Sequence, residues 1–186
     1  MAIRRAIRFM VGSYETVGLE QSYFLAYAAL DAAVGAAADD SIQFTLGASA
    51  FRKLCSKLRK TLTEFAVEHR LSGLVDDVAD KLVELQRRST ARKMERLYNK
   101  LGFTVDDLWK HIGFETGFKR ATRARNELVH SATVADPEQI SRDLVRLHVL
   151  TERILLKLLE WPDNKIWRWY DQELRWMNHR EDPSRT

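Results

Sequence analysis

The sequence is poor in the residues that interrupt helices or cross-link chains. Its 186 residues include one cysteine, three prolines and eight glycines. The single thiol, Cys55, excludes a disulfide within the chain and a thiolate-rich metal site, and a reducing cytoplasm is the simplest compartment for it. The scarcity of proline and glycine, together with abundant Ala, Leu, Arg, Lys and Glu, favours an all-α protein.

Long apolar runs are also missing. No stretch approaches the roughly 20 uninterrupted apolar residues of a membrane span. The first residues, MAIRRAIRFMVGSY, resemble a signal peptide in their early basic pair, but the apolar run breaks at Arg8 and Gly12. We therefore expect a cytoplasmic protein with no membrane partner.

The charge balance is only mildly basic. Thirty Lys and Arg against 26 Asp and Glu give a formal net charge of +4 and a pI near 9.3. Such a balance permits a polyanionic partner without demanding one, because phosphate is attracted by local clusters of cations. Whether the chain binds a polyanion therefore depends on how its basic residues are distributed.

Apolar residues recur at helical spacing along most of the chain. Residues 19–38 are apolar around the whole helix and rich in small side chains, which predicts a central core helix. Asp136 as N-cap and Pro137 at the first helical position predict a long last helix over 137–160. Helices are also predicted at 49–68 and 71–86, and another ends at about 101 with a stop at Gly102 before a helix capped by Thr104 that includes Ile112. Gly113 and Gly117 allow a loop or cap before a helix over 118–130. The segment 2–11 is either a first helix or a remnant, and 164–177 is a candidate for one more helix. The fold class is a helical bundle of five to seven helices.

The C-terminal region differs from the rest in its aromatic content. We expect one helical domain over 1–160, followed by an aromatic-rich helix and polar tail over 161–186. Trp167, Trp169, Tyr170 and Trp176 are too many aromatic rings to lie free in water. The tail should dock either on the domain or on a partner.

Motifs for metal or nucleotide chemistry are lacking. The five histidines are scattered, and none has a second His or a Cys at ligand spacing. The chain also has no glycine-rich phosphate loop and no nucleophile elbow. We therefore expect no metal and no cofactor.

Two basic runs are candidates for contact with a nucleic acid. RRSTARKMER contributes Arg88 and Arg92, and KRATRAR contributes Lys119, Arg120 and Arg123. Two such stripes would form a groove that follows phosphates if they met in space. The alternative is that each run is a solvated helix face.

The second run leads into RARNELVH, residues 123–130. Five helical steps turn about 500°, so Arg125 and His130 point about 140° apart, whereas Asn126 and His130 share a face. In one chain this spacing favours a solvated helix face. Cooperation between Arg125 and His130 requires a frayed helix end or a residue from another chain.

RARNELVHSA, followed by the leucine-rich ISRDLVRLHVLTERILLKLL, resembles the HEPN superfamily. That family is marked by Arg, four to six residues and then His, commonly with a polar residue after the Arg, and Arg125, Asn126 and His130 fit. The early apolar YFLAYAALDAAV and the basic RRSTARKMERLYNKL extend the likeness over residues 1–160. The arrangement looks most like the ApeA-like HEPN branch found in antiphage proteins.

The resemblance implies a metal-independent endoribonuclease that acts as a homodimer, with the motif helices facing each other. His130 would be the acid or base, Arg125 would stabilise transition-state charge, and Asn126 would orient His130 or a phosphate. Lys119, Arg120, Arg123, Arg88 and Arg92 would guide the RNA. The products would end in a 2′,3′-cyclic phosphate, and the setting would be antiphage defence or a toxin system.

Two departures leave alternatives open. Ala132 stands where some HEPN toxins have a tyrosine, which argues against the nucleotidyltransferase-paired subgroup. ApeA-like regions often end a longer protein with a sensing domain, so the chain is either a fragment of one or a separate subunit. The competing functions are a non-catalytic HEPN module for dimerisation or RNA binding, and a structural helical scaffold.

Overall fold

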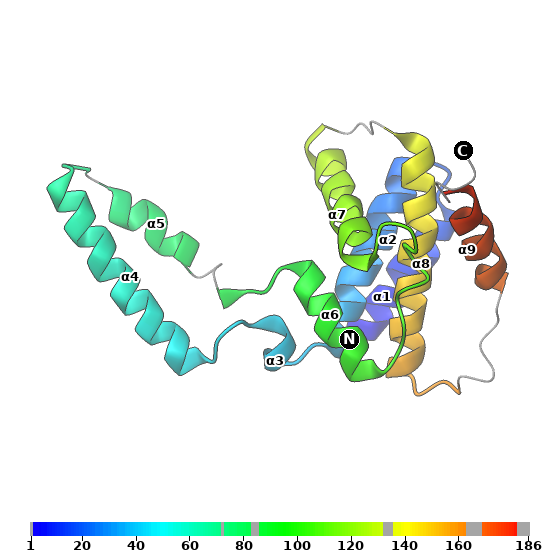
Figure 1. The fold of residues 1–186 in the computed structure, drawn as a ribbon, viewed down its shortest axis with the longest axis horizontal. Coiled ribbons are helices and arrows are strands. Elements are labelled where there is room, and N and C mark those ends of the chain that lie inside the picture. Colours follow the sequence, from blue (N-terminus) through cyan, green and yellow to red (C-terminus); the bar gives the residue numbers. More distant parts are fainter. Residues whose placement is uncertain (1, 72, 83–85, 132–135, 163–168, 182–186) are drawn as a thin grey trace. The chain divides into compact units, whose positions relative to one another are not determined.

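The computed structural model describes residues 2–71, 73–82, 86–131, 136–162 and 169–181. Their regular elements are helices, apart from one isolated β-bridge between Phe44 and Arg87, and the predicted all-α class is confirmed (Figure 1). The helices are α1 (Ala2–Glu15), α2 (Leu19–Ala37), α3 (Asp40–Gln43), α4 (Ala48–Glu68), α5 (Leu74–Leu82), α6 (Thr90–Leu101), α7 (Phe114–Ser131), α8 (Pro137–Leu158) and α9 (Trp169–Arg180). No described helix combines the length with the apolar character that a membrane span requires.

The chain divides into two compact units. The first, called the bundle here, comprises residues 1–37 and 94–186, and the second, the inserted unit, comprises residues 38–93. The boundary predicted at residue 160 stays a prediction. Of the candidate residues, Arg88 and Arg92 belong to the inserted unit, and all the others belong to the bundle.

Helix α2 is the centre of the bundle, where it contacts α1, α7 and α8 (Figure 1). Ala26, Ala29 and Ala33 are fully buried, as are the larger Tyr23 and Leu30. The small side chains let neighbouring helices approach closely, and the larger ones fill the remaining space. The predicted central core helix is thus confirmed, with nearly the predicted bounds.

The start of α8 follows its sequence signals. The side chain of Asp136 accepts a hydrogen bond from the backbone N–H of Gln139 at 2.9 Å, and Pro137 occupies the first turn. Leu147, Leu150 and other apolar residues of one stripe are buried. The predicted N-cap and long last helix are confirmed, because a capped end and a continuous apolar stripe both favour a helix here.

The helix predicted from Thr104 past Ile112 is wrong. Gly102 ends α6 with a φ of 69°, as predicted, but residues 106–112 form turns instead of a helix. The side chain of Asp107 and the carbonyl of Thr104 accept hydrogen bonds from Arg153 of α8. These contacts with α8 satisfy polar groups of the segment without a helical ladder.

Helix α7 begins earlier than predicted. We expected a loop or cap at Gly113 and Gly117 and a helix from about 118, but α7 starts at Phe114 and contains Gly117. The Trp109 ring lies against Gly117, so closely that a Cβ there would lie 2.1 Å from Trp109 Cγ. Gly117 is therefore needed for the close approach of a buried indole, and it does not interrupt the helix.

The last helix docks on the bundle. Helix α9 contacts α8, and its Leu174 and Met177 are each only 2% exposed. Trp176 is 57% exposed, with the guanidinium of Arg180 over its ring at 4.9 Å. Trp167 lies outside the described residues, as do the side chains of Trp169 and Tyr170. Docking on the domain, one of the two alternatives for the tail, thus applies to Leu174 and Met177, whereas Trp176 faces solvent.

The inserted unit contains α3, α4 and α5, of which α4 and α5 pack together. Phe51 of α4 and Leu82 of α5 are buried within it. The backbone N–H of Thr45 donates to the carbonyl of Gln86 at 2.8 Å, which joins the two ends of the unit. The unit is therefore a helical hairpin, and the segments that enter and leave it are paired through their backbones.

Candidate functional site

Helix α7 carries the Arg–Asn–His motif on a continuous helix. Gly117, Phe118, Ala121 and Leu128 form its buried side. The opposite side is exposed and contains the stripe Lys119, Arg123, Asn126 and His130. Their spacing of three and four residues aligns these four side chains along one face.

Arg125 lies outside that stripe, on the side of α7 that faces α2. Its guanidinium lies over the Tyr27 ring, 5.7 Å from the centroid, and Nη1 donates a hydrogen bond to Oδ1 of Asn126 at 3.1 Å. The hydroxyl of Tyr27 is hydrogen-bonded to Thr122 at 2.9 Å, which fixes the ring under Arg125. The structure thus brings Arg125 and Asn126 into direct contact.

His130 lies in the last turn of α7 and is exposed. It stands one turn after Asn126, on the same face, and α7 remains helical through Ser131. The helix end is therefore not frayed at His130, and the angle of about 140° between Arg125 and His130 applies. Within one chain, Asn126 lies between the two in angle, and it bonds to Arg125.

The predicted RNA-guiding cations of α7 differ in their surroundings. Lys119 pairs with Glu115 at 2.8 Å, and Arg123 pairs with Glu127 at 2.8 Å, one turn along the helix in each case. Both pairs are well exposed, so they contribute little to stability and exchange readily with another anion. Arg88 and Arg92 belong to the inserted unit, whereas α7 belongs to the bundle.

Arg120 has a structural partner instead. Its Nε and Nη2 donate to the two carboxylate oxygens of Asp143 in α8, at 3.1 and 2.9 Å. Asp143 is 1% exposed and also accepts hydrogen bonds from Trp109 Nε1 at 2.8 Å and Arg146 Nη1 at 3.0 Å. A guanidinium held in this way stabilises the core, and a role for Arg120 in guiding RNA stays a prediction.

These groups, buried or partly buried, form what we call the Asp143 cluster: Trp109, Arg120, Asp143, Arg146 and Glu181. Arg146 is fully buried and lies over the Trp109 ring at 5.8 Å. Its Nη2 donates to Glu181, just after α9, at 2.6 Å. The cluster therefore joins the turn before α7, helix α7 itself, helix α8 and the end of α9.

Sequence reasoning missed this cluster, although a signal existed. Asp143 stands four residues before Leu147 and seven before Leu150, so it continues the apolar stripe of α8. A charge on an apolar stripe indicates a buried ion pair, because an unpaired buried charge is too costly. The identity of its partners, which come from distant segments, is not contained in that pattern.

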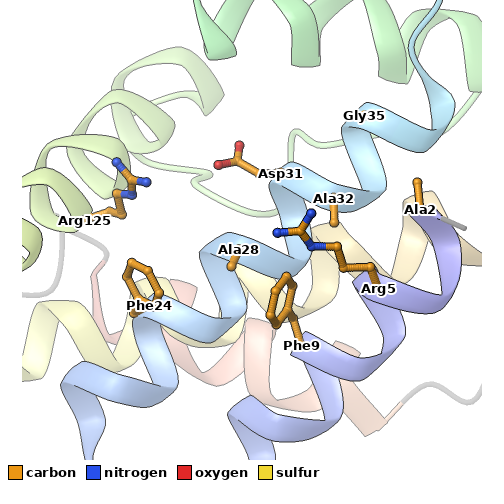
Figure 2. A pocket seen from close by; sticks show the side chains of 9 residues that line it. All are labelled: Ala2, Arg5, Phe9, Phe24, Ala28, Asp31, Ala32, Gly35 and Arg125. Carbon is orange, nitrogen blue, oxygen red and sulfur yellow. The ribbon is translucent and has the colours of Figure 1, made fainter.

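A pocket of about 690 Å³ opens beside Arg125, and we call it the α1–α2 pocket. Figure 2 shows Arg125 on one side of it, Arg5 and Phe9 of α1 on the other, and the residues of α2 between them. The α2 residues share one helix face: Phe24, Ala28, Asp31, Ala32 and Gly35. Three segments far apart in sequence thus meet at one opening.

A buried histidine lies elsewhere in the bundle. His148 of α8 packs against the Tyr14 ring, with the ring centroids 4.1 Å apart. Ser13 Oγ donates to the carbonyl of Met10 at 2.6 Å, so its lone pair accepts from Nε2–H of His148 at 2.7 Å. Burial lowers the pKa of His148 to about 4, which keeps the ring neutral at pH 7.

Within the described part of the chain, no group of three or more His, Cys, Asp or Glu side chains is arranged to hold a metal ion. Comparisons with protein-family models, with curated proteins and with solved structures find no match for this chain. The chemistry of the candidate site must therefore be argued from its own residues.

Proposed function

We propose that the chain is a metal-independent endoribonuclease of the HEPN type, which acts as a homodimer with a site composed of Arg125, Asn126 and His130. One observation carries the proposal: the exposed His130 lies one turn after Asn126, and Asn126 is hydrogen-bonded to the guanidinium of Arg125. The Asn126 side chain thus lies between a proton-transfer group, His130, and a cation, Arg125, and these are the residue types of the HEPN motif.

The reaction needs no metal because RNA contains its own nucleophile. A base removes the proton of the 2′-OH, and the oxygen attacks the adjacent phosphorus. The bond to the 5′ oxygen breaks, and this oxygen takes a proton from the acid. His130 serves as acid or base, since an imidazole ring can both accept and donate a proton. Arg125 stabilises the charge on the phosphorane, and the products are a 2′,3′-cyclic phosphate and a 5′-OH.

The direction of the side chains supports a dimer. Arg125 and His130 point about 140° apart on α7, so one phosphate does not readily meet both in a single chain. A second copy related by a two-fold axis supplies the missing group from its own α7. Val129, beside His130, is 50% exposed and offers apolar surface for such a contact.

RNA cleavage in the presence of EDTA tests the proposal. The wild-type chain should cut total RNA, but not DNA of the same sequence, and Arg125→Ala and His130→Ala should each abolish cutting. Arg59→Ala, on an exposed position of α4, is the matched control and should cut normally. A requirement for magnesium, or cutting that survives both substitutions, would contradict the proposal.

Mixing the two inactive variants tests the composite site. If Arg125 of one chain works with His130 of the other, each heterodimer of Arg125→Ala and His130→Ala retains one intact site. After the subunits exchange, about half the dimers are heterodimers, so roughly a quarter of the wild-type activity should return. No recovery in a mixture with proven subunit exchange would place both groups in one chain.

A non-catalytic RNA-binding module is the second candidate, supported by the exposure of Lys119 and Arg123 on one face of α7. It predicts RNA binding that weakens steeply with salt, without any new RNA ends. The catalytic proposal predicts instead that expression slows bacterial growth and that His130→Ala relieves the effect, as expected for a defence or toxin protein. Sequencing of the new 5′ ends would then identify the RNA target.

A further inference from the structure

We infer that the α1–α2 pocket binds a nucleotide, with the phosphate held by Arg5 and Arg125 and the base placed against Phe24. The pocket is large enough, because about 690 Å³ lies within the range of small-molecule sites. Its walls combine aromatic rings and cations, the two features that a base and a phosphate require.

The two arginines are held in place by aromatic rings instead of acids. Arg5 lies over the Phe9 ring at 5.3 Å from the centroid, and Arg125 lies over the Tyr27 ring at 5.7 Å. Neither contact neutralises a positive charge, and stacking on a ring leaves the N–H edge of a guanidinium open to an oxygen anion. Figure 2 shows the two guanidinium groups on opposite sides of the opening.

Further positive charge lies next to the pocket on α1. Arg4 and Arg8 are exposed, and together with Arg5 and Phe9 they line a neighbouring cavity of about 420 Å³. Asp31 is the acidic residue among those that line the α1–α2 pocket. Two guanidinium groups against one carboxylate leave the pocket positive, and the arginines of α1 increase this potential, so the expected ligand is an anion.

The floor of the pocket suits a flat ring. Ala28, Ala32 and Gly35 present almost no side-chain volume, and Phe24 is 44% exposed at the edge of this floor (Figure 2). A phenyl group beside an open, shallow surface lets a base stack without displacing protein atoms. Inorganic phosphate alone would leave this apolar area unused, which favours a nucleotide.

The inference deepens the proposed function and rests on it for the source of the nucleotide. Arg125 belongs both to the pocket and to the candidate site, so in a ribonuclease the bound unit is the nucleotide next to the cleaved phosphate. The pocket itself is defined without reference to cleavage. Binding measurements therefore test it independently.

Calorimetric titration of the full chain with AMP, adenosine and inorganic phosphate at low salt is the direct experiment. AMP should bind with a dissociation constant of about 1 mM or tighter, and adenosine and phosphate should each bind more weakly. Arg5→Ala should weaken AMP binding roughly tenfold, as expected for the loss of a charge-assisted contact to phosphate. Asp31→Asn should tighten it severalfold, because a repulsive carboxylate becomes neutral.

Opposite effects from two substitutions in one pocket cannot arise from a general loss of folding. Arg59→Ala, in the inserted unit, should leave AMP binding unchanged. The inference is overturned if AMP does not bind at millimolar concentration, or if Arg5→Ala binds AMP as well as Arg59→Ala does.

Competition with a labelled single-stranded RNA, measured with the His130→Ala chain, identifies the source. Displacement of the RNA by AMP means that the pocket takes a unit of the strand, and binding of AMP without displacement means that it takes a free nucleotide. AMP binding without RNA cleavage would refute the proposed ribonuclease and keep the pocket. RNA cleavage without AMP binding would refute the nucleotide pocket and keep the proposed ribonuclease.

Discussion

The Asp143 cluster and the α1–α2 pocket contain the same kinds of residue in opposite surroundings. Each has one aspartate near two arginines and at least one aromatic ring, but Asp143 is 1% exposed, whereas Asp31 is exposed. In the cluster, every arginine donates to a carboxylate, and the group joins four segments of the bundle. In the pocket, the arginines lie over aromatic rings, which do not neutralise their positive charge. Burial thus separates residues that stabilise the fold from residues that can bind a ligand.

The largest expected difference between the two regions concerns their aspartates. Asp143→Ala should lower the free energy of unfolding by about 3–5 kcal/mol, because the fully buried Arg146 loses a charge partner and Trp109 Nε1 loses its acceptor. Asp31→Ala should change it by less than about 1 kcal/mol, since an exposed carboxylate keeps its contact with water. Urea denaturation of both variants at pH 7 measures the difference. Equal effects would mean that the cluster does not depend on its central charge.

The histidines of the bundle give the second contrast. The pKa of His148 is about 4 in the folded chain and near the ordinary 6.5 in the unfolded chain. The unfolded state therefore binds a proton first as the pH falls, and stability declines between pH 6.5 and pH 4. The whole loss is roughly 3 kcal/mol, as expected when the pKa of a buried histidine falls to about 4.

Replacing His148 by Gln should flatten that decline, because glutamine still donates to Ser13 Oγ but takes up no proton. His130→Gln is the matched control, since the ring it removes is exposed in the folded chain. Denaturation curves at pH 7.5 and pH 4.5 for the three chains separate this effect from that of the carboxylates. If wild type and His148→Gln lose the same stability, His148 does not control it.

Much of the fold can be predicted from the sequence where local signals agree. The all-apolar segment of α2, the cap at Asp136 and the stop at Gly102 each depend on residues close together in the chain. The segment after Gly102 could not be predicted, because its Thr104 carbonyl and Asp107 carboxylate accept hydrogen bonds from Arg153, about 50 residues further on. Gly117 was misjudged for the same reason, since only the position of Trp109 explains it.

The candidate site divides in the same way. The order of Arg125, Asn126 and His130 and their angles follow from one helix, so they could be predicted. That Arg125 faces Arg5 across a pocket depends on the packing of α1 and α7 on α2, which no local pattern contains. Arg120 belongs to the same basic run as Arg123, yet one binds a buried carboxylate and the other an exposed one. Sequence periodicity cannot distinguish them without the partner helix.

The smallest of the three contrasts concerns two glycines within helices. Replacing a helical glycine by alanine normally stabilises a helix by up to about 1 kcal/mol. Gly35→Ala in α2 should show this gain, because a Cβ there would meet no atom within 4 Å. Gly117→Ala in α7 should instead cost about 1–3 kcal/mol, because its Cβ would overlap the Trp109 ring and the buried indole cannot move without releasing Asp143.

Thermal and urea unfolding of the two alanine variants measure these opposite signs directly. A Gly117→Ala chain that also loses the near-ultraviolet circular dichroism of its tryptophans would connect the cost to the indole at position 109, the buried one in the described core. If both substitutions stabilise the chain, the Trp109 ring does not lie against α7 as closely as 2.1 Å implies. The closed packing around Asp143 would then tolerate added volume as readily as the open pocket does, and the contrast between the two regions would be reduced to their charges.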